Sequence, residues 1–162
     1  MTKTNYHTPV LLKESIDALI IDPNGVYVDV TFGGGGHSKE ILKRLTEKGK
    51  LISFDQDPDA IKNKINDRRL SVINSNFQYM NNFVRNLGIT KVDGIIADLG
   101  ISSYQIDNRE RGFSYRFDSK LDMRMDKKSN IDAYKIINTY SSDKLATLFY
   151  AYGDFKNSFQ IS

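Results

Sequence analysis

The residues best suited to chemistry are a run of glycines and the acidic residues that end later hydrophobic runs. Four consecutive glycines, Gly33–Gly36, follow the β-branched run 26–30, and a helical pattern begins at about Ser38. Glycine reaches backbone conformations closed to other residues and lets a ligand lie against the main chain. A strand, a glycine turn and a helix in this order form the first half of a nucleotide-binding βαβ unit. Taken alone, the run is also compatible with a flexible surface loop.

An acidic cluster stands at the end of the next hydrophobic run. Asp55 follows residues 50–54, about 20 residues after the glycine turn, where a carboxylate in a βαβ unit accepts hydrogen bonds from ribose hydroxyls. Asp57 is the better N-cap for the following helix, because Pro58 stands in its first turn. We therefore expect Asp55 to bind a ribose, with a plain strand-end acid as the alternative.

Two more candidates follow the third and fourth hydrophobic runs. Phe77 comes shortly after residues 71–74 and can lie beside an adenine ring, although a large aromatic residue after a strand is as often part of the core. Asp98 ends the run 92–97. Ligands of parallel sheets bind outside the carboxyl ends of the strands. We expect the glycine turn, Asp55, Phe77 and Asp98 to converge there.

The sequence excludes several other kinds of site. No Gly-Lys-Ser/Thr follows the glycines, so phosphate binding by a Walker lysine is not expected. The absence of cysteine excludes disulfides and thiolate metal sites, and two histidines make a histidine-rich metal centre implausible. No Gly-x-Ser-x-Gly elbow supports a serine hydrolase. NAD and S-adenosylmethionine both remain possible adenosine-bearing ligands.

Extended and helical patterns alternate along the chain up to Ser103 and must position these candidates. Strands are predicted at 26–30, 50–54, 71–74 and 92–97. Helices are predicted within 7–21, at 38–47, from Pro58 and at 80–87. Right-handed crossovers then give a parallel sheet covered by helices on both faces. A doubly wound sheet usually has more strands, so we expect the chain to be the front part of something larger.

The chain changes character after Ser103. A polar loop interleaved with aromatic residues occupies 108–118, and further helices are predicted at 132–137 and 142–152. The net charge of +3 permits a polyanionic partner without demanding one. No apolar stretch approaches the roughly 20 residues that cross a bilayer, and the first residues lack the apolar core of a secretory signal. We therefore expect no membrane contact and a cytoplasmic location.

Six longer motifs are specific enough to suggest a family. They are HTPVLL at 7–12, DVTFGGGGHS at 29–38, DQDP at 55–58, DLGISS at 98–103, RGFS at 111–114 and LDMRMD at 121–126. In this order and spacing they resemble the bacterial RsmH (MraW) family of S-adenosylmethionine-dependent methyltransferases, which act on N4 of a cytidine in 16S ribosomal RNA. The resemblance runs from about Tyr6 to the end of the chain.

The resemblance implies a fold, a cofactor and site residues. The fold is a Rossmann-like class I methyltransferase with a parallel sheet flanked by helices, the cofactor is S-adenosylmethionine rather than NAD, and no metal is expected. A cofactor-binding core would occupy residues 1–104, and residues 105–162 would form the start of a helical RNA-recognition insert. The implied partner is 16S rRNA or the small ribosomal subunit. The family's cofactor contacts map to Gly35, Gly36 and His37 at the turn, Asp55 at the ribose, Phe77 near the adenine, and Asp98 and Gln105 at the methionine end.

Catalysis on a cytosine amine needs alignment more than activation by a strong base. The N4 lone pair is delocalised into the ring, so polar acceptors must hold the NH2 group in line with the sulfonium methyl. We expect Asp98 to be such an acceptor, assisted by Ser102, with a purely cofactor-binding Asp98 as the alternative.

Basic and aromatic residues of the later motifs are candidates for contact with RNA phosphates and unpaired bases. They are Arg109, Arg111, Phe113, Tyr115, Arg116, Phe117, Arg124 and Lys127. A solvated loop that folds over the cofactor is the alternative for this set.

Family members are longer than this chain, and a Ser-Phe-His-Ser-type segment of their later part is absent from it. We therefore expect the chain to stop before the fold is complete. Two function classes remain: an rRNA methyltransferase, and a truncated fragment that binds cofactor or RNA without catalysing methyl transfer. A dehydrogenase is a distant third.

Overall fold

The structure is a computed structural model of the 162-residue chain, and it describes residues 9–162. The chain divides into two compact units. The first holds the residues up to Tyr104 together with Met125–Lys127, and the second holds Gln105–Arg124 and Lys128–Ser162. The sequence predicted one boundary after residue 104 and no return of the chain to the first unit. His7 and Thr8 of the first motif lie outside the described residues.

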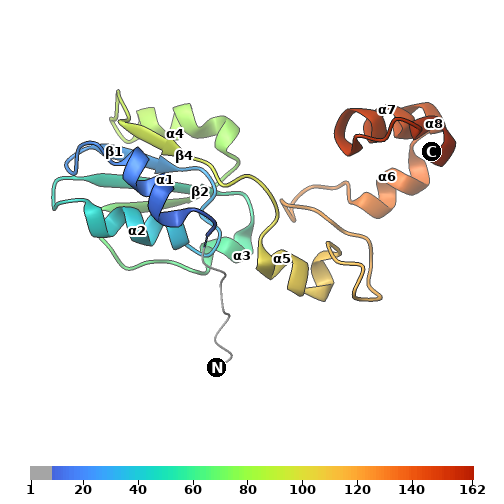
Figure 1. The fold of residues 1–162 in the computed structure, drawn as a ribbon, viewed down its shortest axis with the longest axis horizontal. Helices are drawn as coiled ribbons and strands as arrows, with labels where there is room; N and C mark the ends of the chain where they lie inside the picture. The colour runs from blue at the N-terminus through green and yellow to red at the C-terminus, as the bar shows by residue number, and fades with distance from the viewer. Residues whose placement is uncertain (1–8) are drawn as a thin grey trace. The chain divides into compact units, whose positions relative to one another are not determined.

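A four-stranded parallel sheet forms the centre of the first unit (Figure 1). Its strands are β1 (Val26–Asp29), β2 (Lys50–Asp55), β3 (Leu70–Asn74) and β4 (Gly94–Ile96), in the order β3-β2-β1-β4. Asp29 pairs in register with Ser53 and Ile96, and Asp55 pairs with Asn74. The predicted parallel sheet is confirmed, and all four strands end at the same side of the sheet.

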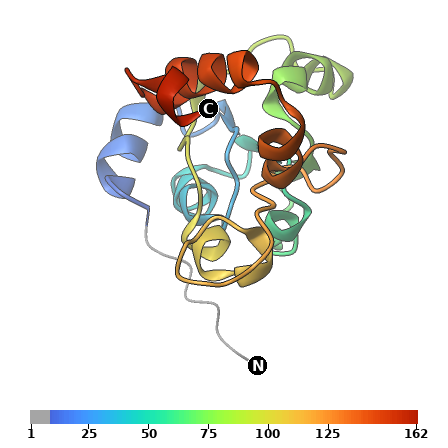
Figure 2. The same cartoon turned by 90° about the vertical axis from the view of Figure 1, so that its right-hand side faces the viewer.

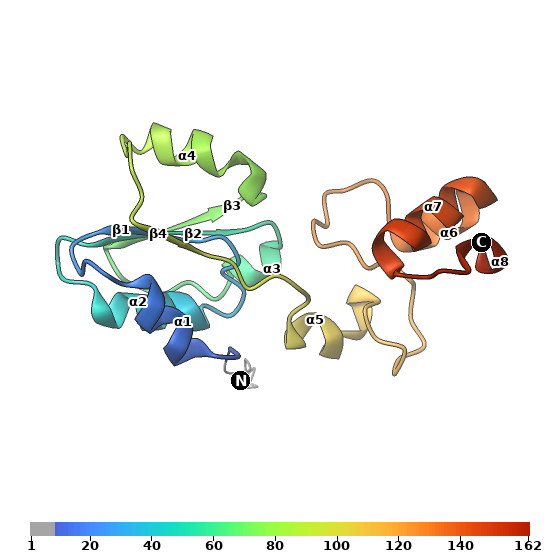
Figure 3. The ribbon, with the colours of Figure 1, turned by 45° about the horizontal axis from the view of Figure 1, so that its top comes forward.

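Helices cover both faces of this sheet. α1 (Leu12–Leu19) and α2 (Gly36–Arg44) lie on one face, and α4 (Met80–Asn86) lies on the other (Figure 3). The short helices α3 (Pro58–Ile61) and η1 (Phe77–Tyr79) follow β2 and β3. Three of these helices, α2, α3 and η1, therefore come next in the chain after the carboxyl ends of β1, β2 and β3, where a bound ligand would meet their first turns.

Two helices begin at other residues than the sequence predicted. α1 begins at Leu12 rather than near Pro9, because Leu11 adopts a left-handed conformation with φ 52°. α2 begins at Gly36 rather than Ser38, because Gly35 in a left-handed conformation ends the preceding turn. The glycine run is thus shared between the turn and the helix.

The alternation of side chains along the strands divides the core into two layers. The layer under α1 and α2 contains Ile16, Tyr27, Ile41, Leu42, Leu45 and Leu51. The layer under α4 contains Val28, Val30, Ile52, Phe54 and Val84. Successive residues of β1 and β2 point into opposite layers, so the sheet is buried on both faces.

The second unit is helical. Its elements are α5 (Ser103–Asp107, which starts at the boundary), η2 (Arg109–Arg111), α6 (Ala133–Thr139), α7 (Ser142–Gly153) and α8 (Ser158–Ile161). α7 and α8 are neighbours and are drawn in red in Figures 1 and 2. The helices predicted at 132–137 and 142–152 are confirmed. Within residues 9–162, no helix combines the length and the apolar character needed to span a membrane.

Candidate functional site

Asp29 organises the glycine turn from inside the sheet. It is fully buried at the end of β1, and its carboxylate accepts hydrogen bonds from the Ser38 hydroxyl at 2.7 Å and the Thr31 N–H at 3.0 Å. The Ser38 hydroxyl lies 2.8 Å from that of Ser53 on β2. Burial raises the pKa of Asp29, and the hydrogen bonds from Ser38 and Thr31 limit the rise. One carboxylate therefore connects the strand end, the turn and the start of α2.

Sequence reasoning gave Asp29 no role of its own. The signal was present, because an acid in a β-branched run is followed by a serine at the start of the next helix. The side chains of such a pair can hydrogen-bond to each other only if the turn folds back over the strand end. Ser53, on the neighbouring strand, was found only through the tertiary structure.

The glycine turn itself is shaped by close approaches to its backbone. Gly35 has φ +75°, in the left-handed region that favours glycine. A Cβ on Gly36 would lie 2.6 Å from the Pro9 Cγ, so the lead-in segment packs directly against the turn. The ring of His37 is buried, with 6% of the residue exposed. The first N–H groups of a helix lack partners within it, so a contact of His37 with a cofactor would use its backbone N–H.

Asp55 ties the glycine turn to the end of β2. One carboxylate oxygen accepts the Gly33 N–H at 2.8 Å, and the other accepts the Asp57 N–H at 2.9 Å. Asp57 in turn accepts the Asp59 N–H at 3.0 Å as the N-cap of α3, which confirms its predicted role. A carboxylate offers about four acceptor positions, so holding the turn and accepting ribose hydroxyls are compatible.

Phe77 is not a core residue. It opens η1 and is 44% exposed. The side chain of its neighbour Asn76 donates to the Gln56 side chain at 2.8 Å, which joins the start of η1 to the residue after Asp55. An exposed ring, next in sequence to the residue that makes this link, suits contact with a planar base.

Asp98 is exposed beyond the end of β4, and its N–H donates to the Thr31 hydroxyl at 2.7 Å. Ser102 is half-buried just before α5. Gln105 is a buried residue of α5 and belongs to the second unit. Hydrogen bonds therefore bring together the glycine turn, Asp55 and Asp98, and Phe77 opens the short helix that follows the neighbouring strand β3.

The arginines among the proposed RNA contacts bind other parts of their own unit. The partners are the Asp118 carbonyl for Arg109, the Arg124 carbonyl for Arg111, Asp107 for Arg116 and Asp122 for Arg124. Arg111 is buried, and its guanidinium stands 5.8 Å from the centre of the Phe113 ring. These contacts fold the loop onto its own unit. Both the RNA role and the alternative of a loop that folds over the cofactor stay predictions.

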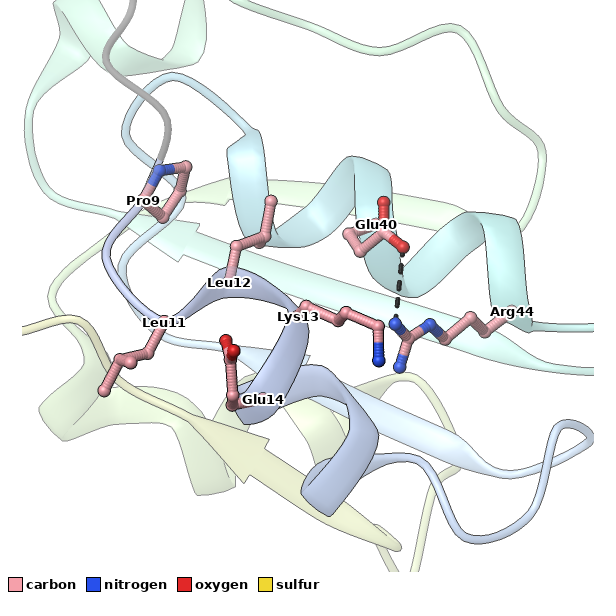
Figure 4. A pocket seen from close by; sticks show the side chains of 7 residues that line it. All are labelled: Pro9, Leu11, Leu12, Lys13, Glu14, Glu40 and Arg44. Carbon is pink, nitrogen blue, oxygen red and sulfur yellow. Dashed lines mark hydrogen bonds and ion pairs between the residues drawn. The ribbon is translucent and has the colours of Figure 1, made fainter.

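An open pocket of about 550 Å³ lies where the start of α1 meets α2 (Figure 4). Its lining residues are Pro9, Leu11, Leu12, Lys13, Glu14, Glu40 and Arg44. Arg44 contacts Glu40 at 3.5 Å and also pairs with Asp17. None of the site residues predicted above lines this pocket, so it is distinct from the cofactor candidates.

Comparison with known proteins identifies the family that carries this arrangement. A model of the MraW methylase family matches residues 4–162. The chain belongs to the MraW methylase family. The resemblance seen in the motifs is confirmed, and so is the Rossmann-like methyltransferase fold class, by the family match and the helix-flanked parallel sheet.

Relatives in the MraW methylase family share more than half of the aligned residues. The chain is 58% identical over 158 residues to ribosomal RNA small subunit methyltransferase H of Christiangramia forsetii. It is 58% identical over 156 residues to the protein of the same name in Bacteroides fragilis, and 55% over 157 residues to that of Flavobacterium johnsoniae. These alignments cover 96% to 98% of this chain. The chain spans about half the length of these curated relatives, 51% to 52%.

Proposed function

We propose that this chain is the cofactor-binding part of an S-adenosylmethionine-dependent methyltransferase that methylates N4 of a cytidine in 16S rRNA of the small ribosomal subunit. Membership of the MraW methylase family and the names of the relatives support methyl transfer to ribosomal RNA. The cofactor and the N4 position rest on the motif resemblance. The observation that carries the proposal is the glycine turn held at 2.8 Å by the strand-end acid Asp55.

The residues of the first unit fit the parts of this cofactor. The N–H groups of Gly36 and His37, at the start of α2, suit the methionine carboxylate, because a helix N-terminus favours an anion. Gly35 leaves the backbone open to close approach. Asp55 suits the ribose hydroxyls, and the exposed ring of Phe77 suits the adenine.

When bound, the cofactor supplies a methyl group on a positively charged sulfur. With the cofactor bound, Asp98 would accept a hydrogen bond from the cytosine NH2 group and orient its nitrogen for transfer of that methyl. Ser102 assists as a second acceptor. The exposed carboxylate of Asp98 is accessible to such a substrate, and its backbone is fixed to the glycine turn through Thr31. In the alternative role, Asp98 binds only the cofactor.

Calorimetry with S-adenosylhomocysteine on this 162-residue chain tests the cofactor assignment. We expect binding, and we expect Asp55→Asn to weaken it about tenfold or more, because hydrogen bonds to a charged group are worth about 1.5–3 kcal/mol. Asp57→Asn is the matched control, since asparagine caps a helix as well as aspartate does. Binding of NAD in place of S-adenosylhomocysteine would contradict the proposal.

A second candidate is a fragment that binds cofactor or RNA without transferring a methyl group. It is favoured by one observation, that the chain spans about half the length of its curated relatives. Transfer of labelled methyl from S-adenosylmethionine to small-subunit RNA separates the two. Cofactor binding without transfer supports the fragment, whereas label at cytosine N4 supports the enzyme.

A further inference from the structure

The chain leaves the first unit after Tyr104, and Met125–Lys127 belong to that unit again. On this return, the Lys127 ammonium lies 2.6 Å from one carboxylate oxygen of Asp59. The other oxygen of Asp59 lies 2.6 Å from the Lys62 ammonium. The Asp59 side chain is only 9% exposed, so both contacts are made with a carboxylate largely removed from water.

Asp59 is linked through two hydrogen bonds to the proposed ribose acceptor. Its N–H donates to the carboxylate of Asp57, and the N–H of Asp57 donates to that of Asp55. The lysine on the returning segment is therefore attached to the same loop that holds the glycine turn.

The ion pairs of Lys62 and Lys127 with Asp59 differ in the structure that each needs in order to form. Lys62 is three residues away and its side chain is 75% exposed, so its pair forms locally. Lys127 is 68 residues away and its side chain is 40% exposed, so its pair exists only when the returning segment lies on the first unit. The pKa of the Asp59 carboxyl is held below its usual range, with the hydrogen bond from Lys127 as the largest cause and that from Lys62 next.

We propose that Lys127 is a positioning residue, whose ion pair with Asp59 fastens the end of the 121–126 motif to the loop that carries Asp55. We call this ion pair of Lys127 with Asp59 the tie. It rests on the proposed function in one respect, because its effect is to order the Asp55 loop before the cofactor binds. Cofactor and tie stabilise the same loop, so each strengthens the other. Lys127 thereby leaves the set of cations that face RNA phosphates.

Hydrogen exchange of the backbone amides of residues 121–126 tests the tie in this chain, with and without S-adenosylhomocysteine. We expect Lys127→Met to raise the exchange rate about tenfold, as loss of a charge-assisted hydrogen bond implies. Lys62→Met, which removes the local partner of the same carboxylate, should leave these amides unchanged. Lys127→Arg should restore slow exchange. By calorimetry, Lys127→Met should bind S-adenosylhomocysteine about fivefold more weakly than Lys62→Met.

The outcomes separate this tie from the proposed function. Equal exchange of residues 121–126 in Lys127→Met and Lys62→Met would overturn the tie, even if both variants bind S-adenosylhomocysteine. An unmodified chain that binds no S-adenosylhomocysteine, while the contrast between the two variants persists, would support the tie and count against the cofactor assignment.

Discussion

At the scale of single residues, the buried carboxylate of Asp29 is the least expected feature of the site. Its hydrogen bonds to Thr31 and Ser38 satisfy it inside the core, yet burial still raises its pKa. A carboxylate kept in such a place costs stability whenever it is ionised. In return, the two oxygens of the Asp29 carboxylate fix both ends of the turn, at Thr31 and at Ser38.

Asp29→Asn should change how stability depends on pH. A raised pKa means that the folded chain holds a proton that the unfolded chain has lost above the ordinary value of 3.8. The contribution of Asp29 to stability therefore falls as pH rises above 3.8 and through the higher folded-state pKa. An asparagine can accept from Thr31 and donate to Ser38 without that pH dependence. Thermal unfolding of the unmodified chain and the Asp29→Asn variant should be compared between about pH 4 and 8. The stability of the variant relative to the unmodified chain should rise as the pH rises. A constant difference across this range would contradict the assignment.

Asp98→Asn separates two roles of the exposed acid. If Asp98 holds the cytosine amine as proposed, methyl transfer should fall about a hundredfold, as for loss of one oriented polar group at a reacting centre. Cofactor affinity should then change little. Parallel calorimetry and methyl-transfer assays measure both quantities, and a proportionate loss of both would show that Asp98 serves the cofactor alone.

At the scale of elements, the glycine turn depends on the segment that precedes α1 as well as on its own residues. Pro9 occupies the space in which a Cβ of Gly36 would stand, 2.6 Å from Cγ and 2.8 Å from Cδ. Because the proline ring cannot move without its backbone, the contact fixes the lead-in segment against the start of α2. The first motif of the sequence and the glycine motif are in this way one structural unit.

Gly36→Ala should destabilise the chain by about 1–3 kcal/mol, the usual range for an overpacked site. Pro9→Ala removes the ring atoms that the new Cβ would meet, so Gly36→Ala should cost less in that background. Urea unfolding of the two single variants and the double variant measures this coupling, expected at about 1 kcal/mol or more. Strict additivity would mean that the turn relaxes without Pro9.

At the scale of the whole molecule, the two units differ in how they are stabilised. Both apolar clusters found among residues 9–162 lie in the first unit. In the second unit, the buried hydrophobic side chains are Leu145 and Ala146, in the same described range, and several aromatic side chains of α7 and α8 are exposed. Ion pairs such as Arg116 with Asp107 contribute to that unit, but exposed pairs are worth little.

We therefore expect the second unit to open before the first. Amide hydrogen exchange at neutral pH should be slower in β1 and β2 than in α6 and α7, by about tenfold or more, because opening a unit with little buried apolar surface costs less free energy. α4, which packs on the sheet, provides an internal comparison and should resemble the strands. Equal protection of α7 and β1 would refute this ranking.

Much of the first unit follows from local patterns in the sequence. Periods of hydrophobic residues predicted four strands and the helices between them, and the parallel sheet followed from their alternation. Asp57 was predictable as an N-cap because capping is a matter of neighbouring residues. The motifs also sufficed to indicate the MraW methylase family, which the family match confirms.

Other features depend on contacts between residues far apart in the chain. Sequence left Phe77 evenly divided between contact with an adenine and the core, and only the tertiary structure showed that the residue is 44% exposed. The pairing of Lys127 with Asp59 could not be predicted either, because nothing local selects one carboxylate among many.

The glycine run of residues 33–36 was recognisable from sequence as a backbone that a ligand can approach, because that property belongs to glycine itself. Its exact form was decided by tertiary structure. Asp29 below it, Asp55 beside it and Pro9 against it come from three different parts of the fold. Asp29 and Asp55 meet there because parallel strands end together, which is a property of the sheet and not of any one segment.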